Sequence, residues 1–306
     1  MSLKIVFMGT PEFSVPALEA LINNKFEILS IYTQPPKKSK RGQKINISPV
    51  QKFSEKNNLP VRNPENLSND EEYNFIKNLS ADLAVVVAYG KLIPTNILKT
   101  TKLGFVNIHA SLLPKWRGAA PIQRAIMNGD KKTGVSIMKI EDKLDSGPIL
   151  ASKELVLDQN AIYGEIQKKL SLMGSDLLIE SLKNIENGKA KFIDQVHSNS
   201  TYAKKIDKNE TKINWNLDAN KVIAHIHGLS PNPGAWFEYE DERFKVLRAN
   251  KSAVSGNPGT LLDENLTIAC KSDSIQILEI QRQGKNKQTS KDFLLGKKIS
   301  KGSILT

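Results

Sequence analysis

Short apolar runs alternate with amphipathic stretches over the first part of the chain. The apolar run Leu3–Met8 ends at Gly9, and a helical pattern begins near Ser14. Ser14 suits the N-cap position, and Pro16 lies in the first turn, where a missing N–H costs nothing. The opening of the chain therefore predicts a strand, a turn and a helix.

The same alternation continues as far as about Asn187. Further strands are expected at Glu27–Thr33, Asp82–Ala88, Gly104–His109 and Gly134–Ile140. Helices are expected at Pro49–Asn57, Glu71–Leu79, Pro121–Asn128 and Ala161–Asn187. Alternation of this kind predicts an α/β fold with a doubly wound, mostly parallel sheet and helices on both faces.

The pattern changes after about Lys189, where the helical periodicity stops. Short runs such as Phe244–Leu247 and Ile275–Ile280 are then separated by turn formers, including Pro231–Gly234. This pattern of short apolar runs and turns predicts a smaller, mainly β domain, which would be a barrel or a sandwich. A length of 306 residues also suggests two domains. The boundaries expected are 1–189 for the first domain, 190–207 for a linker and 208–306 for the second domain.

Composition narrows the class of protein. With 39% hydrophobic and 25% charged residues, collagen, disordered chains and membrane bundles are excluded. The single cysteine, Cys270, cannot form an intramolecular disulfide, and no signal-peptide pattern opens the chain. A cytoplasmic location is expected, without a membrane partner. The net charge of +12 makes nucleic acid the first candidate partner.

The positive charge is concentrated in two segments. Residues 37–44 contain no acid and no apolar periodicity, which is typical of a mobile basic loop; its cations are Lys37, Lys38, Lys40, Arg41 and Lys44. The second segment, Arg282–Lys301, carries seven cations and one acid, Asp292. Each segment taken alone also fits a solvated surface. Two such clusters in one basic chain favour contacts with a polyanion.

The chemically richest stretch begins at the strand expected over Gly104–His109. Alternation places Asn107 and His109 on one face at its C-terminal end, where open parallel sheets bind ligands. Both side chains can donate hydrogen bonds to a carbonyl oxygen that becomes negative when it is attacked. The alternative is a core histidine satisfied by a neighbouring carbonyl.

An acid follows at a turn before the next apolar run, in Leu144-Asp145-Ser146-Gly147. Asp145 could enter the same site, where it could orient a histidine or accept a proton from an attacking amine. An Asp-Ser-Gly sequence is more often only a turn. The dinucleotide fingerprint fails because Pro11 and Ser14 stand where glycines are needed, and no metal-ligand spacing is present.

These residues together resemble a known family. Asn107-x-His109, then Ser111-Leu112-Leu113-Pro114-x-x-Arg117-Gly118, and later Asp145-x-Gly147 are similar to the signature of enzymes that transfer a formyl group from 10-formyltetrahydrofolate. Gly9–Phe13, Ala88-Tyr89-Gly90 and Pro231–Ala235 resemble the branch of that family that formylates initiator methionyl-tRNA. The likeness extends over nearly the whole chain.

The resemblance implies a Rossmann-like formyltransferase domain, a linker and a C-terminal OB-like barrel that helps to hold the tRNA. It implies Asn107 and His109 as oxyanion donors and Asp145 as the group that orients His109. It implies a folate pocket, without a metal, lined by Ser111, Leu112, Leu113 and Pro114 and by Ala88, Tyr89 and Gly90. The Leu113–Pro114 peptide is a candidate for the cis form. The tRNA contacts expected are Lys38, Lys40 and Arg41.

Three alternatives keep part of this interpretation. A formyltransferase acting on a small amine, such as a sugar nucleotide or glycinamide ribonucleotide, would keep the three catalytic residues but would not need a second basic domain. A hydrolase that releases formate would use water as the acceptor. A non-enzymatic RNA-binding module would explain the charge but would leave Asn107, His109 and Asp145 without a role.

Overall fold

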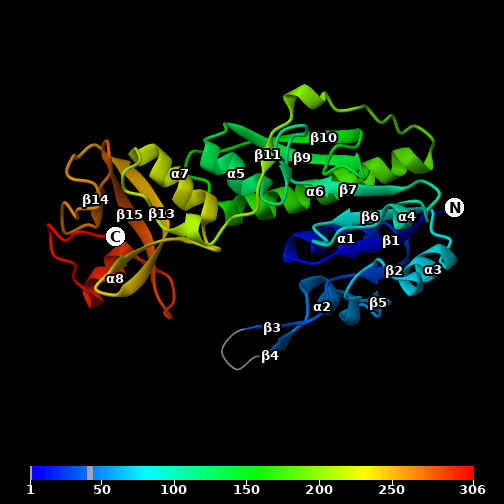
Figure 1. Ribbon diagram of the computed structural model, residues 1–306, viewed down its shortest axis with the longest axis horizontal. Helices are drawn as coiled ribbons and strands as arrows, with labels where there is room; N and C mark the ends of the chain where they lie inside the picture. Colours follow the sequence, from blue (N-terminus) through cyan, green and yellow to red (C-terminus); the bar gives the residue numbers. More distant parts are fainter. Residues whose placement is uncertain (1, 40–43) are drawn as a thin grey trace. The chain divides into compact units, whose positions relative to one another are not determined.

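The computed structural model describes residues 2–39 and 44–306 (Figure 1). The chain forms two compact units that interleave along the sequence. The first unit comprises Met1–Gly118, Gly134–Leu155 and Lys168–Tyr202; the second comprises Ala119–Thr133, Val156–Gln167 and Ala203–Thr306. The linear boundaries at residues 189 and 207 stay a prediction.

A seven-stranded sheet forms the body of the first unit, in the order β10-β9-β7-β6-β1-β2-β5 (Figure 1). Its strands are β1 (Lys4–Gly9), β2 (Glu27–Tyr32), β5 (Val61–Arg62), β6 (Leu83–Val87), β7 (Phe105–His109), β9 (Lys132–Lys139) and β10 (Ile149–Val156). The five neighbouring strands β7, β6, β1, β2 and β5 are parallel to one another, whereas β9 runs antiparallel to β7. The predicted α/β fold with a mostly parallel sheet is confirmed.

Helices cover both faces of this sheet. On one face, Gly174 of α6 (Tyr163–Glu186) packs so closely on β7 that an added Cβ would lie 2.8 Å from Ile108 Cγ2. On the other face, Ile76 of α3 (Asp70–Asn78) and Ile97 of α4 (Thr95–Leu98) are buried in a cluster with Val86 and Phe105. The residues of β7 therefore alternate between two helical layers.

The remaining helices of the sequence prediction are also present. These are α1 (Val15–Asn23), α2 (Pro49–Lys56) and α5 (Pro121–Asn128). The Ser48 side chain caps α2 by accepting a hydrogen bond from Gln51 N, and Asn69 caps α3 in the same way through Glu72 N. Ser14 occupies the N-cap position of α1 but makes no capping bond; its Oγ donates to Val87 O at 2.6 Å instead.

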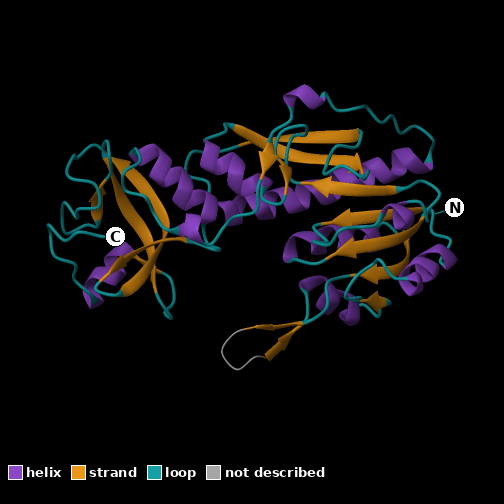
Figure 2. Cartoon of the chain, viewed as in Figure 1, coloured by secondary structure: helices purple, strands orange, loops and turns teal. Residues whose placement is uncertain are grey.

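The second unit is built on an antiparallel sheet that curves into a half-barrel (Figure 2). Its strands are β12 (Ala235–Tyr239), β13 (Glu242–Ser252), β14 (Thr267–Ala269), β15 (Ser274–Arg282) and β16 (Gln288–Thr289). The predicted β character is confirmed, but the expectation that helices stop after Lys189 is wrong. Helices α7 (Ala219–Leu229) and α8 (Ser290–Gly296) lie in this part of the chain.

Helix α7 belongs to the core of this second unit. Val222, Ile226 and Leu229 are fully buried in one cluster with Phe237 and Phe244 of the sheet. Their spacing places them on one side of the helix, which is the ordinary pattern of a helix that covers a sheet.

The basic segment also departs from its prediction at its two ends. Strand β3 (Lys37–Ser39) pairs antiparallel with β4 (Lys44–Asn46), so a short ribbon stands where a loop was expected. A hairpin of this kind is held by local backbone hydrogen bonds and needs no apolar alternation. Lys40 and Arg41 lie outside the described residues, as does the side chain of Lys38.

Smaller elements complete the described chain. These are the strands β8 (Arg117–Gly118) and β11 (Tyr202–Ala203), and the 3₁₀ turns Glu12–Ser14, His197–Asn199 and Asn209–Thr211. Within residues 2–39 and 44–306, every helix is too short or too polar to cross a membrane.

Candidate active site

Asn107 and His109 lie at the C-terminal end of β7. Because Ile108 faces α6, both side chains point to the opposite side of the sheet. His109 is 5% exposed, whereas Asn107 is partly exposed. The strand therefore presents a partly accessible amide beside a buried imidazole.

The two ring nitrogens of His109 have different partners. Nε2 lies 2.9 Å from Trp116 O, and since a carbonyl oxygen only accepts, Nε2 carries a proton. Nδ1 lies 3.6 Å from Asp145 Oδ2. His109 thus has the neighbouring carbonyl expected of a core histidine and also the carboxylate expected of a catalytic one.

The turn that carries Asp145 follows from local sequence. Asp145 has φ +46°, a left-handed conformation that aspartate tolerates better than most residues. Its Oδ2 accepts a 2.7 Å hydrogen bond from Gly118 N. Gly147 is required because an added Cβ would lie 2.1 Å from Lys139 O. The Asp145-x-Gly147 spacing is therefore explained by backbone geometry.

Two further polar residues that the motif analysis did not assign to the catalytic centre lie next to it. Arg117 is buried and donates from Nε and Nη2 to Gln195 Oε1, at 3.1 and 2.7 Å. Arg117 Nη2 also lies 2.9 Å from His197 Nδ1. Gln195 has no local pattern that points to a site, because it lies in the irregular segment expected to be a linker.

The Ser111–Pro114 loop is fixed by hydrogen bonds from β9. Ser136 Oγ donates to Ser111 O at 2.8 Å and accepts from Leu113 N at 3.3 Å. Ser111 and Leu113 are buried, Leu112 and Pro114 are half-buried, and the Leu113–Pro114 peptide is cis. The loop thus directly follows the strand that carries Asn107 and His109.

A second turn leaves the neighbouring strand β6 at Ala88-Tyr89-Gly90. Ala88 and Gly90 are exposed, with φ of +46° and +78°. The Tyr89 side chain is 1% exposed, and its burial raises the pKa of the phenol to about 12. Its ring therefore belongs to the core, and only its backbone is available to a ligand; Tyr89 O accepts from Thr10 Oγ1 and Gln34 Nε2.

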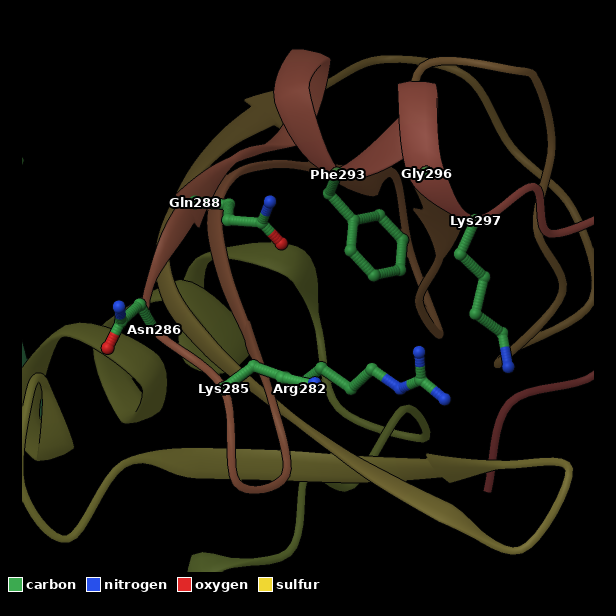
Figure 3. A pocket seen from close by; sticks show the side chains of 7 residues that line it. All are labelled: Arg282, Lys285, Asn286, Gln288, Phe293, Gly296 and Lys297. Carbon is green, nitrogen blue, oxygen red and sulfur yellow. The ribbon is translucent and has the colours of Figure 1, made fainter.

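Three of the seven C-terminal cations line a pocket of about 350 Å³ in the second unit (Figure 3). Arg282 of β15, Lys285 and Lys297 line it, together with Phe293 of α8. Glu242 partly balances this charge, since it lies 2.5 Å from Arg282 and 3.0 Å from Lys297. The Arg282–Lys301 segment is thus less positive in space than in sequence.

In the described part of the chain, no three His, Cys, Asp or Glu side chains gather closely enough to hold a metal ion.

Comparison with known families gives two matches along this chain. Residues 3–182 match the model described as formyl transferase, and residues 205–298 match the formyl transferase C-terminal domain. A methionyl-tRNA formyltransferase from Pelagibacter ubique is 50% identical, with 100% of this chain and 99% of the relative covered. One from Chelativorans sp. is 46% identical, with both chains fully covered.

Solved structures show the same fold at low identity. WlaRD, a sugar 3N-formyl transferase, is 18% identical with a TM-score of 0.68, over 94% of this chain and 100% of its own. HypX from Aquifex aeolicus, in complex with tetrahydrofolic acid, is 17% identical with a TM-score of 0.67, over 100% of this chain and 51% of its own.

Proposed function

The chain belongs to the methionyl-tRNA formyltransferase family, and we propose that Asn107, His109 and Asp145 carry out its formyl transfer. The reaction of the protein is the formylation of methionyl-tRNA. In our proposal the donor is 10-formyltetrahydrofolate, and the acceptor is the α-amino group of methionine on initiator tRNA. The product is N-formylmethionyl-tRNA, used to begin translation in the cytoplasm.

The contact between His109 and Asp145 is the observation that carries the proposed roles. Nδ1 and Oδ2 lie 3.6 Å apart, and both side chains are largely buried. A carboxylate held at this distance from an imidazole orients the ring and stabilises its positive charge. Asn107, on the same face of β7, adds an uncharged donor that is accessible from outside the sheet.

Formyl transfer needs charge stabilisation and proton movement at this centre. As the amine attacks the formyl carbon, the carbonyl oxygen becomes negative, and the Asn107 amide donates to it. His109 joins this interaction by turning its Nε2–H from Trp116 O to the new oxyanion. The amine proton passes to Asp145 or His109, directly or through water, and N10 of the folate is protonated as it leaves. No covalent intermediate with the protein is needed.

The turns after β6 and β7 form our proposed donor site. Adjacent parallel strands end at the same edge of a sheet, so Ala88–Gly90 and Ser111–Pro114 lie at that edge. Left-handed backbone at Ala88 and Gly90 exposes peptide groups to a ligand, while Ser136 holds the other turn rigid. Backbone groups of both turns would bind the polar edge of the pterin.

The basic ribbon and the second unit provide our proposed tRNA contacts. Lys38 belongs to β3, and Lys40 and Arg41 follow it in the sequence; these three cations and those of the C-terminal segment supply the positive charge. Phosphate contacts of this kind position an RNA without reading its bases.

One assay tests the proposed substrates directly. The purified full chain is supplied with 10-formyltetrahydrofolate and one acceptor at a time: charged initiator tRNA, an amino-sugar nucleotide, or water alone. We expect rapid formation of N-formylmethionyl-tRNA and little formylation of the sugar or release of formate. Faster transfer to the amino sugar would contradict the proposed acceptor, and formate release at an equal rate would indicate a hydrolase.

A further inference from the structure

Gln195 makes hydrogen bonds on every side of its amide beside the catalytic turn. It is 6% exposed, and its Nε2 donates to Asp145 O at 2.9 Å and to Gly147 O at 2.7 Å. Its Oε1 accepts from Arg117 Nε and Nη2. Since carbonyls only accept and a guanidinium only donates, these partners fix the orientation of the amide.

The carbonyls that Gln195 binds belong to the residues on either side of Ser146. Asp145 holds a left-handed φ of +46°, a conformation that a residue with a Cβ keeps only when its surroundings impose it. Two donors on the turn restrain its backbone in that conformation. The direction of the Asp145 carboxylate, and hence its 3.6 Å approach to His109, follows from that backbone.

The segment that carries Gln195 is itself anchored to the same region. Ile193 and Ile149 exchange two backbone hydrogen bonds of 2.8 Å, which tie this segment to the start of β10 just after the turn. Arg117, on the other side of the Gln195 amide, precedes Gly118, whose N–H binds Asp145 Oδ2. Gln195 therefore binds the main chain of Asp145 directly. It is also linked to the Asp145 side chain indirectly, through Arg117 and the adjacent Gly118.

We propose that Gln195 is a positioning residue for formyl transfer. It holds the main chain of Asp145 so that the carboxylate faces His109, and it acts through Asp145 rather than on the substrates. This inference rests on the catalytic role proposed for Asp145.

Two substitutions at Gln195 remove its hydrogen bonds while keeping a side chain of similar volume. Gln195→Glu keeps an acceptor for Arg117 but loses both donors to the turn, and Gln195→Leu loses all the bonds. We expect kcat to fall ~10-fold to ~100-fold in each, because small displacements of catalytic groups have effects of this size. KM for the formyl donor and for charged tRNA should change less than about twofold.

The matched control is Gln51→Leu. Gln51 donates to Glu55 within α2 and is partly exposed, so kcat should stay at the wild-type value. If Gln195→Leu does not fold, Gln195→Glu provides the same comparison with Arg117 still paired. Wild-type kcat in Gln195→Glu, or a raised KM with unchanged kcat, would overturn the positioning role.

A double-mutant cycle with Asp145→Ala distinguishes positioning from general loosening of the fold. If Gln195 acts through Asp145, Gln195→Glu should lower single-turnover rates less than about threefold in the Asp145→Ala background. An equal loss in both backgrounds would refute the inference. Full activity of Asp145→Ala alone would instead refute the proposed catalytic site, so the two failures can be told apart.

Discussion

The Asp145 carboxylate is held by Gly118 while it faces His109: Oδ2 lies 2.7 Å from Gly118 N and 3.6 Å from His109 Nδ1. One oxygen therefore links the turn after β9, the segment after the Ser111–Pro114 loop, and the end of β7. The hydrogen bond from Gly118 N holds this oxygen in place, so that the carboxylate stays directed at the imidazole.

The roles of Asn107 and His109 as oxyanion donors predict a loss of turnover when either is removed. We expect Asn107→Ala and His109→Ala to lower kcat ~100-fold to ~1000-fold, as is typical for the loss of one such donor. The KM values for both substrates should change far less, because the interaction forms mainly in the transition state. Steady-state kinetics with charged initiator tRNA measures both. Near wild-type turnover in both variants would exclude this assignment.

Gly147 predicts a second effect at the same centre, through backbone geometry alone. In Gly147→Ala the new Cβ would lie 2.1 Å from Lys139 O, so the turn must shift and carry Asp145 with it. We expect kcat to fall by ~100-fold while the folate and tRNA affinities remain nearly unchanged.

Circular dichroism and thermal unfolding serve as the control for Gly147→Ala. The variant should fold, since the strained contact is confined to one turn between two strands. Wild-type kcat in a folded Gly147→Ala protein would show that the position of Asp145 does not limit the reaction.

The sequence predicted most of the first unit because its signals are local. Continuous apolar runs marked β1 and β6, and alternation along β7 placed Asn107 and His109 on one face. Helix α7 was missed because its apolar positions, such as Val222 and Ile226, lie among turn-rich segments that indicated β structure. An apolar repeat of about four residues over one short stretch is a weak helix signal when the segments around it indicate β structure.

The part of the site that escaped prediction depends on long-range contacts. Gln195 reaches Asp145 and Gly147 from a polar, irregular segment, and no spacing rule connects these positions. Arg117 of the Ser111–Gly118 motif is buried, and a buried guanidinium needs acceptors somewhere in the fold. Its burial is known only from the structure, so the motif by itself indicated neither this need nor the residue that meets it.

The basic ribbon predicts a change in the salt dependence of tRNA binding. Each cation that neutralises a phosphate releases condensed counterions. The logarithm of the binding constant therefore falls linearly with the logarithm of the salt concentration. Replacing Lys38, Lys40 and Arg41 together with Ala should weaken tRNA binding and reduce that slope by up to about 2 to 3. Binding titrations over a series of salt concentrations measure it, and affinity for the formyl donor should not change.

A charge-matched variant controls for the lost net charge. Lys168, Lys169 and Lys183 are exposed on α6, and their replacement with Ala removes the same total charge. If this control flattened the salt dependence as much as the ribbon variant, the ribbon would contribute only to the overall field. An unchanged slope in the ribbon variant would mean that other cations, such as those of Arg282–Lys301, make the phosphate contacts.

His227 predicts a loss of stability in mild acid. It is 1% exposed on α7, and its Nε2 accepts a hydrogen bond from Ala249 N of β13. Burial, and then the nearby Arg248 charge, lower the pKa of the imidazole from 6.5 to about 4. Protonation would therefore break the bond to Ala249 and leave a charge inside the second unit.

The sign of the effect follows from which state binds the proton first. As the pH falls below 6.5, His227 is protonated in the unfolded chain but stays neutral in the folded one, so the free energy of unfolding decreases. The decrease ends near pH 4, where the folded state also takes up the proton, and amounts to at most ~3 kcal/mol. Other groups with lowered pKa values, including His225 and Glu210, add losses of the same direction.

The variant His227→Gln isolates this contribution, because a glutamine oxygen can accept from Ala249 N but does not titrate. Urea unfolding of both proteins between pH 4 and pH 7 gives the difference in their free energies of unfolding. The wild type should lose stability relative to the variant as the pH falls from 6.5 to about 4, while the losses due to His225 and Glu210 cancel. Parallel curves over that range would mean that His227 is protonated equally in both states, and that the acid sensitivity of the second unit has another origin.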